Sequence, residues 1–198
     1  MSIQSIIDRL FESGENFIDF GFGLGDSNDT NAEYFQAKRD KKKYKVQKNL
    51  ENPEEAANII AILNDNILNF IAFLDKKYPE DDRIKKMKKR YHPQNVMEGS
   101  PFNKEKSTSY SLSKGEKIVF CVRSGKDPNK FHNTNLLMFV VIHELTHLAS
   151  SSYGHNTEFK DNFKFLLREA IDNKFYDRID FQRNNAEYCG MTITSTPV

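Results

Sequence analysis

The sequence is poor in cysteine, since its 198 residues include only Cys121 and Cys189. Two cysteines so far apart are too few for a disulfide scaffold or a four-cysteine zinc site. Such sparse cysteines fit a reducing compartment. We therefore expect an intracellular protein of the cytoplasm or the nucleus.

The chain also lacks an excess of either charge and lacks long hydrophobic runs. Its 29 Lys and Arg and 28 Asp and Glu leave a net charge of +1, which gives no overall argument for nucleic acid or an anionic membrane surface. The N-terminal segment MSIQSIIDRLFESGENFIDF has neither the basic start nor the unbroken apolar core of a secretory signal. The longest apolar run, LLMFVVI, is far shorter than the roughly 20 residues of a membrane-spanning helix. We expect a soluble protein without a membrane span.

The composition changes along the chain near Asn52. Apolar residues at helical spacing predict a short amphipathic helix in the first dozen residues. The glycine-rich stretch GFGLGDSNDTN and the basic run AKRDKKKYKVQK follow, and both are typical of a linker. We therefore predict a helix and basic linker in residues 1–51 and one domain in residues 52–198.

The pattern of the second segment predicts an α+β fold. A long core helix starts at Pro53, and TSYSLSKGEKIVFCVRS reads as two strands around a turn at Lys114 and Gly115. NTNLLMFVVIHELTHLASSSYG reads as a helix with a polar cap and a glycine stop, and NTEFKDNFKFLLREAIDNKF as a second amphipathic helix. The tail from Tyr176 is predicted to be irregular, with a short strand at MTIT.

The most informative residues are those of HELTH, at positions 143–147. On a helix, His143 and His147 project from one face, about 40° apart, so both imidazoles can reach one ion. Glu144 lies about 100° round the helix, which suits contact with a water held on the metal. A buried group of this kind without a metal would leave a carboxylate and two imidazoles needing partners in a core. The pattern therefore predicts a metal site.

A catalytic zinc needs a third protein ligand and one open position. Ser150 and Ser151 are poor ligands, whereas Gly154 can end the helix through a left-handed turn that lets His155 fold back. Glu158 is the alternative third ligand, although one helical turn further on it more plausibly stabilises the start of the next helix. The sequence favours His155.

Three neutral imidazoles leave the zinc ion its full double charge. Such an ion polarises a carbonyl and lowers the pKa of its bound water to about 7. Glu144 would take the proton of this water and pass it to the leaving amine. The prediction is thus one Zn²⁺ per chain, held by His143, His147 and His155, that hydrolyses peptide bonds.

The stretches HELTH, LASSSYG and HNTEF resemble the zincin metallopeptidases, and more narrowly their WLM and SprT-like group. In that group H-E-x-x-H is followed by a short spacer, a histidine and, four positions later, a phenylalanine. KGEKIVFCVRS, NTNLLMFVVIHELTHLA, GHNTEFKDNFKFLLREAI and YCGMTI are similar to WLM-type metallopeptidase-like proteins of large DNA viruses. The resemblance spans residues 91–193 and leaves out the first 50.

This resemblance implies a small zincin-like fold, with a helix packed on a small sheet and the zinc helix behind it. It implies His143, His147 and His155 as ligands and Glu144 as catalytic acid and base. Cellular members are DNA-dependent proteases that degrade proteins crosslinked to DNA, and a viral member would act in the host cytoplasm or the virion. The seven-residue spacer between His147 and His155 is longer than in many cellular members, so substrate preference does not carry over.

Other residues have a functional and a structural interpretation. Tyr153 and Tyr188 are candidates for oxyanion or substrate contacts, although packing against a loop is commoner for such aromatics. If Cys189 bound the zinc as a thiolate, it would block the open position and give a latent enzyme. A small buried cysteine without a metal is the commoner case. His92 and His132 are predicted to be surface residues.

Two partners are expected from the sequence. The first is a protein or peptide substrate, which in zincins lies extended along a sheet edge; one strand of the predicted hairpin would serve. The second is DNA, for which KRDKKKYK and IKKMKKR are candidate phosphate-binding stretches, although such charge runs are more commonly solvated faces or linker. The leading function is a zinc-dependent metalloendopeptidase, and the alternative is a catalytically silent interaction or virion protein with a zincin fold.

Overall fold

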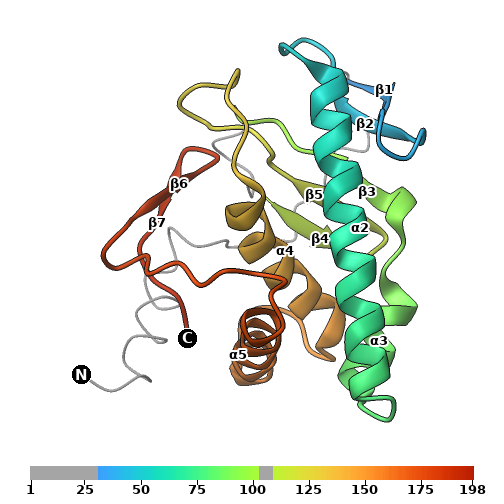
Figure 1. The fold of residues 1–198 in the computed structure, drawn as a ribbon, viewed down its shortest axis with the longest axis vertical. Helices are drawn as coiled ribbons and strands as arrows, with labels where there is room; N and C mark the ends of the chain where they lie inside the picture. The colour runs from blue at the N-terminus through green and yellow to red at the C-terminus, as the bar shows by residue number, and fades with distance from the viewer. Residues whose placement is uncertain (1–30, 103–108) are drawn as a thin grey trace.

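The computed structural model describes residues 31–102 and 109–198, so the predicted N-terminal helix lies outside the described residues. These residues form an α+β fold, as predicted, with a five-stranded mixed sheet and a separate two-stranded hairpin (Figure 1). The sheet has the strand order β1-β2-β3-β5-β4. Its strands are β1 (Ala32–Gln36), β2 (Lys43–Gln47), β3 (Val96–Glu98), β4 (Tyr110–Leu112) and β5 (Lys117–Phe120).

The predicted hairpin is confirmed and forms one edge of this sheet. β4 pairs antiparallel with β5, and β5 pairs parallel with β3. The turn between β4 and β5 has positive φ at Ser113, Lys114 and Gly115. β4 is therefore an edge strand, as is β1 on the other side, and it also contacts α4 (Thr134–Ala149).

The prediction of a linker in the basic run before Asn52 is wrong. β1 and β2 pair antiparallel there, and β2 joins β3 in parallel, so the sheet extends across the predicted boundary. In β2, Tyr44 and Val46 are buried while Lys43 is exposed, which is the period-two alternation of a half-buried strand. The many lysines conceal this alternation in the sequence.

The long core helix is confirmed as α2 (Pro53–Lys77). It has Pro53 in its first turn, Glu54 and Glu55 beside it, and Lys76 and Lys77 in its last turn, which complements the helix dipole. It contacts β1, β2 and β3 as well as α3 and α4 (Figure 1). Among the described residues it is the one helix that meets the length and composition of a membrane span, a test that buried core helices also pass, and ten of its residues are buried.

A second helix, α3 (Asp82–Arg90), was not predicted from the charged segment that forms it. Asp81 caps it by accepting a hydrogen bond from the backbone N–H of Arg83. Only Ile84 and Met87 of α3 are buried. Two apolar anchors among basic residues are a weak periodic signal, which explains why the segment looked irregular. The 3-10 turn η1 (Pro93–Asn95) leads from α3 to β3.

The two predicted C-terminal helices are confirmed as α4 and α5 (Thr157–Asp172). Asn133 caps α4 and Asn156 caps α5, each through its side-chain oxygen. Thirteen of the residues of α4 are buried, because α4 contacts α2, α3, α5 and the edge strand β4. Figure 1 shows α4 in the middle of the molecule, with α5 below it. His143, Glu144 and Thr146 of α4 therefore lie inside the protein.

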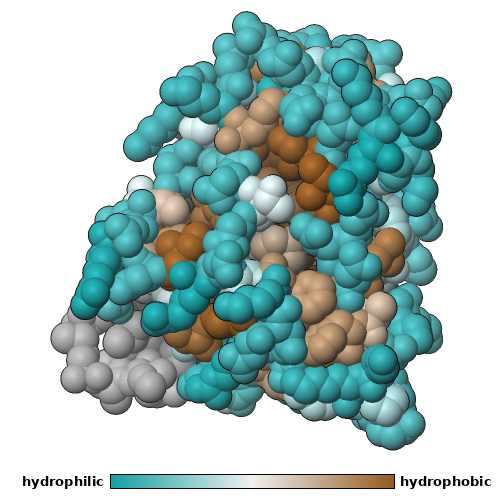
Figure 2. Space-filling view, in the orientation of Figure 1, coloured by the Kyte–Doolittle hydropathy of each residue, from teal (hydrophilic) through white to brown (hydrophobic). Residues whose placement is uncertain are grey.

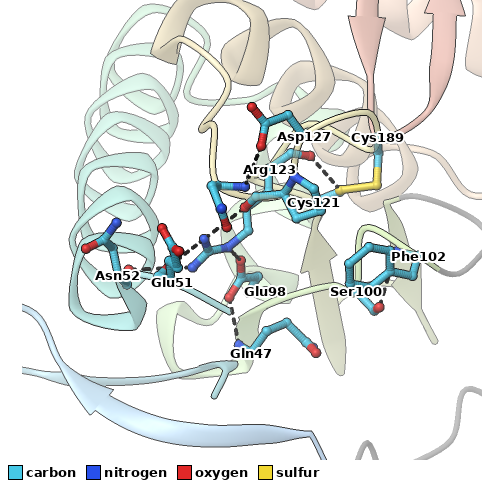
Figure 3. Close-up of polar contacts among 12 residues, drawn as sticks. Gln47, Glu51, Asn52, Glu98, Ser100, Phe102, Cys121, Arg123, Asp127 and Cys189 are labelled. Atoms are coloured by element: carbon cyan, nitrogen blue, oxygen red, sulfur yellow. Dashed lines mark hydrogen bonds and ion pairs between the residues drawn. A yellow bond between two sulfur atoms is a disulfide. The ribbon is translucent and has the colours of Figure 1, made fainter. Parts of the chain in front are cut away.

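The tail contains the predicted strand β7 (Met191–Ile193) and also β6 (Ala186–Tyr188), which was not predicted. A disulfide between Cys121 and Cys189 fastens this hairpin to the end of β5, as Figure 3 shows. Gly125 packs directly on the hairpin, because an added Cβ would lie 2.3 Å from the backbone nitrogen of Gly190. The sequence analysis did not predict this pairing of Cys121 with Cys189.

A buried ion pair joins the sheet to the start of α2 (Figure 3). Nε of Arg123 lies 2.7 Å from Oε1 of Glu98, and both side chains are fully buried. Arg123 also donates to the carbonyl of Glu51, and Glu98 accepts from the backbone N–H of Gln47. Buried charges are tolerated only with such partners.

The face drawn in Figure 2 is mostly polar. Figure 2 shows hydrophilic residues over most of one face, with hydrophobic residues visible between them. The large hydrophobic side chains that are exposed among the described residues are Tyr34, Leu68, Phe102 and Tyr153.

Candidate metal centre

The three predicted metal ligands lie together. His143 and His147 project from one face of α4, with ring centroids 5.0 Å apart, as their spacing predicts. The ring of His155 lies 5.1 Å from that of His143 and 5.0 Å from that of His147. One ring nitrogen of each histidine lies within 4.8 Å of the others. The described residues thus contain a three-histidine cluster.

The route of the chain to His155 differs from the prediction. α4 ends at Ala149, and its C-cap Ser150 has an extended backbone, so Gly154 does not end the helix. Gly154 does have a positive φ of 76° immediately before His155. The left-handed residue is therefore where the sequence placed it, but it reverses a loop and not a helix end.

Burial keeps the histidines of α4 neutral. His143 is buried, and loss of solvation followed by the neighbouring His147 and His155 holds its pKa well below 6.5. Loss of solvation, with smaller effects of His155 and Lys114, lowers the pKa of His147 to about 3. A neutral imidazole is the form that binds a metal ion. The two histidines of α4 are therefore in the form that binds a metal ion at neutral pH.

Phe159 in the first turn of α5 packs against all three histidines. Its ring centroid lies 4.9 Å from His143, 4.5 Å from His147 and 4.6 Å from His155. The sequence placed this residue on the apolar face of a helix and, by resemblance, four positions after the third ligand. It did not predict the contact with every ligand ring, which holds the imidazoles in place and keeps water from one side of the cluster.

Glu144, the residue after His143 on α4, lies in an unusual environment. It is 1% exposed, and within residues 31–102 and 109–198 neither of its carboxylate oxygens has a hydrogen-bond partner. Burial raises its pKa well above 4.5. A buried carboxyl without partners costs several kcal/mol, so a protein has little reason to keep one for stability.

The donor set fits zinc. Nε2 of His155 lies 3.2 Å from Nε2 of His143. Two nitrogens bound to one tetrahedral zinc at its usual bond length lie about 3.3 Å apart. Three histidines, which are the residues of the described cluster, could hold one such ion and leave its fourth position to another ligand.

The alternative third ligand is engaged elsewhere. The carboxylate of Glu158 accepts hydrogen bonds from the backbone N–H groups of Ser151 and Ser152, at 2.7 and 2.9 Å. These bonds, with one from the Ser152 hydroxyl, lower the pKa of Glu158 to about 2. Glu158 therefore organises the loop before His155 and is not part of the cluster.

The two tyrosines lie in contrasting places. Tyr153 is 63% exposed, and Nζ of Lys114 lies 4.6 Å from its ring centroid. Tyr188 is buried, and its hydroxyl is hydrogen-bonded to that of Ser109. Burial, with a smaller contribution from the Glu144 carboxylate, raises the pKa of Tyr188. Substrate or oxyanion contacts of either tyrosine stay predictions.

Two weaker expectations are wrong. Cys189 does not approach the metal as a thiolate, because it is in the disulfide with Cys121. His132 is partly buried and not a simple surface residue, since its Nε2 accepts from the backbone N–H of Cys189 and its ring centroid lies 5.1 Å from that of Tyr188. His92 is exposed, as predicted.

No protein-family model matches the chain. In fold it is similar to two crystal structures of Wss1 from Saccharomyces cerevisiae, one of them a mutant. The sequence identities to this chain are 22% and 21%, and the TM-scores are 0.46 and 0.47. Each comparison covers 65% of this chain, and 88% and 90% of the respective Wss1 chain.

The sequence relatives are viral. The chain is 36% identical over 185 residues to the uncharacterized protein R325 of Acanthamoeba polyphaga mimivirus. This alignment covers 87% of this chain and 87% of the mimivirus protein. It is 35% identical over 88 residues to the uncharacterized protein 042R of Invertebrate iridescent virus 3. That alignment covers 44% of this chain and 52% of the iridescent virus protein. The predicted relationship to proteins of large DNA viruses is thus confirmed. The chain belongs to the family of the mimivirus protein R325.

Proposed function

We propose that this protein is a zinc-dependent endopeptidase in which His143, His147 and His155 hold the metal and Glu144 transfers the proton. The observation that carries the proposal is the buried carboxylate of Glu144, which has no hydrogen-bond partner among the described residues and directly follows His143 of the three-histidine cluster on α4. A histidine cluster alone would suit a structural metal. A structural zinc has no use for a carboxylate beside it and would close its fourth position with another ligand.

The chemistry divides between the ion and the protein. When bound, zinc supplies a Lewis acid that polarises a carbonyl and acidifies a coordinated water. Glu144 accepts a proton from the attacking water at a carboxylate oxygen and delivers it to the leaving nitrogen. Its raised pKa suits this role, because a carboxyl that ionises closer to neutral pH both accepts and returns a proton readily.

The edge strand β4 is the proposed platform for the substrate. It pairs with β5 on one side and lies at the edge of the five-stranded sheet, in contact with the metal helix α4. An extended peptide can add to such an edge through its backbone and so present a peptide bond to the centre. Recognition of the main chain suits a peptidase that acts on a protein or peptide substrate.

The test compares wild type, Glu144→Gln and the control Glu54→Gln, which alters an exposed glutamate of α2. Zinc content and cleavage of unfolded casein are measured on each purified protein. We expect zinc in all three and cleavage that is slower by roughly 100- to 10,000-fold only in Glu144→Gln. Zinc-loaded wild type that cleaves no casein and no member of a mixed peptide library would support the silent alternative.

A further inference from the structure

The chain between His147 and His155 follows an irregular path. Residues 150–154, here called the spacer loop, have the sequence SSSYG and lie between the end of α4 and the start of α5. The last carbonyls of a helix and the groups of an irregular loop lack regular backbone partners. Side chains must therefore fix this loop if His155 is to stay beside His143.

Lys114 binds the carbonyl side of the spacer loop. Its Nζ lies 2.6 Å from the carbonyl oxygen of Ser150, 2.9 Å from that of Ser151 and 2.7 Å from that of Ser152. An ammonium group has three donors, so each N–H meets one carbonyl. A single side chain from the β4–β5 turn thus sets the path of three consecutive residues.

The turn that carries Lys114 is itself fixed. Lys114 and Gly115 both have positive φ, at 56° and 113°. An added Cβ on Gly115 would lie 2.3 Å from the carbonyl oxygen of Arg90, so the turn packs directly on the end of α3. Nδ2 of Asn95 also donates to the carbonyl of Gly115. Lys114 therefore projects from a rigid support.

The same loop is held from two other sides. Nη1 of Arg90 donates to the carbonyls of Leu148 and Ser150, at 2.7 and 2.8 Å. On the opposite side, the carboxylate of Glu158 accepts from the backbone N–H groups of Ser151 and Ser152. Two cationic side chains therefore donate to the carbonyls of the loop, and one carboxylate accepts from its amides. Hydrogen bonds to charged groups are about twice as strong as those between neutral groups.

We propose that Lys114 and Glu158 are positioning residues that hold the spacer loop so that His155 is placed for metal binding before the metal arrives. This inference deepens the proposed function, since it rests on the three histidines binding zinc. A loop ordered in advance loses little conformational freedom when its histidine is bound, which raises affinity. Residues that orient ligands in this way commonly contribute roughly 10- to 100-fold in metal affinity.

The competing interpretation is that Lys114 only stabilises the fold. A double-mutant cycle separates the two, because a residue that acts through His155 has no effect once His155 is gone. Zinc affinity is measured by competition with a chelating dye for wild type, Lys114→Met, His155→Ala and the double variant. Lys89→Met, which alters an exposed lysine of α3, is the matched control.

We expect Lys114→Met to weaken zinc binding by roughly 10- to 100-fold in the wild-type background and by less than about 2-fold in the His155→Ala background. The visible absorption of the Co²⁺-loaded protein should change in Lys114→Met and not in Lys89→Met. Equal losses in both backgrounds, or no loss in either, would overturn the inference.

Circular dichroism shows whether each metal-free variant is folded. If Lys114→Met is unfolded, Glu158→Gln, on the opposite side of the loop, replaces it in the same cycle with the same criteria. If Lys114→Met weakens zinc binding only when His155 is present, but the wild type cleaves no peptide, the inference is supported and the proposed function is contradicted. Wild type that binds no zinc overturns both.

Discussion

Nε2 of His155 lies 3.2 Å from Nε2 of His143, although the two residues are twelve positions apart in the sequence. This approach requires the chain to leave α4, reverse at Gly154 and return before α5 begins. The two nitrogens are as close as two ligands of one tetrahedral ion. The seven residues between His147 and His155 therefore complete the site that the helix alone leaves unfinished.

The protonation of this cluster predicts how the stability of the metal-free protein depends on pH. The pKa of His147 falls from 6.5 in the unfolded chain to about 3 in the folded protein, and that of His143 is also lowered. A lowered histidine pKa stabilises the fold above pH 6.5, and this stabilisation is lost as the pH falls below it. The loss is up to about 1.4 kcal/mol per pH unit for each histidine.

Glu144 acts in the opposite direction. Its pKa is raised above 4.5 in the folded protein. Its contribution to the free energy of unfolding is therefore complete below pH 4.5 and is lost as the pH rises. The three groups together predict maximum stability near pH 6.5. Urea unfolding with a chelator present, from pH 5 to 8, should show less loss on the acid side in His147→Leu and less loss on the alkaline side in Glu144→Gln. Unchanged pH profiles in both variants would show that these groups titrate normally.

The buried pair of Arg123 and Glu98 predicts a large effect of one substitution. Arg123→Met leaves the fully buried carboxylate of Glu98 without its cation, which should cost about 3–5 kcal/mol of unfolding free energy. Arg39 and Asp65 form an ion pair with a similar 2.6 Å contact, but their side chains are 52% and 39% exposed. Arg39→Met should therefore cost less than about 1 kcal/mol. Equal losses in urea unfolding would contradict the burial argument.

The Cys121–Cys189 disulfide predicts a redox-dependent stability. It closes a loop with a sequence separation of 68 residues, and the loss of such a crosslink costs about 4 kcal/mol. Replacing both cysteines with serine should lower stability by this amount, and dithiothreitol should bring wild type to the same value. Two free thiols in native, unreduced protein by thiol titration would contradict the pairing. The pairing also removes the argument from cysteines for a reducing compartment, while an intracellular location stays a prediction.

DNA remains a proposed partner. In the structure the two basic stretches flank α2, because Arg39 pairs with Asp65 and Lys88 pairs with Asp75. Those two acidic residues are about 15 Å apart along the helix, and they already neutralise part of the charge. We expect weak binding to duplex DNA whose affinity falls steeply between 50 and 200 mM salt, roughly as the number of phosphate contacts dictates. A flat salt response with single-stranded and duplex DNA would remove this partner.

The candidate metal centre was largely predictable, since local sequence spacing brings its residues together. His143, Glu144 and His147 follow from helical periodicity, and Gly154 signals the reversal before His155. The loop contacts were not predictable in this way. Lys114 was identified only as a turn residue, because its three carbonyl partners are 36 to 38 residues away in sequence.

The missed parts of the fold have a common physical cause. β2 and α3 each bury only a few apolar side chains among many lysines, so their amphipathic patterns are faint. The disulfide joins two solitary cysteines whose proximity depends on how the C-terminal hairpin packs against β5. Such long-range pairings depend on tertiary packing, which periodicity and spacing do not encode.

The zinc content of the purified protein tests the central claim most directly. Elemental analysis should find about one zinc per chain in wild type and much less than one in His155→Ala, with copper and iron near zero. The control His92→Ala, at an exposed histidine outside the cluster, should retain the wild-type content. Wild type without zinc after purification in zinc-supplemented buffer, or an equal content in His155→Ala, would contradict the account.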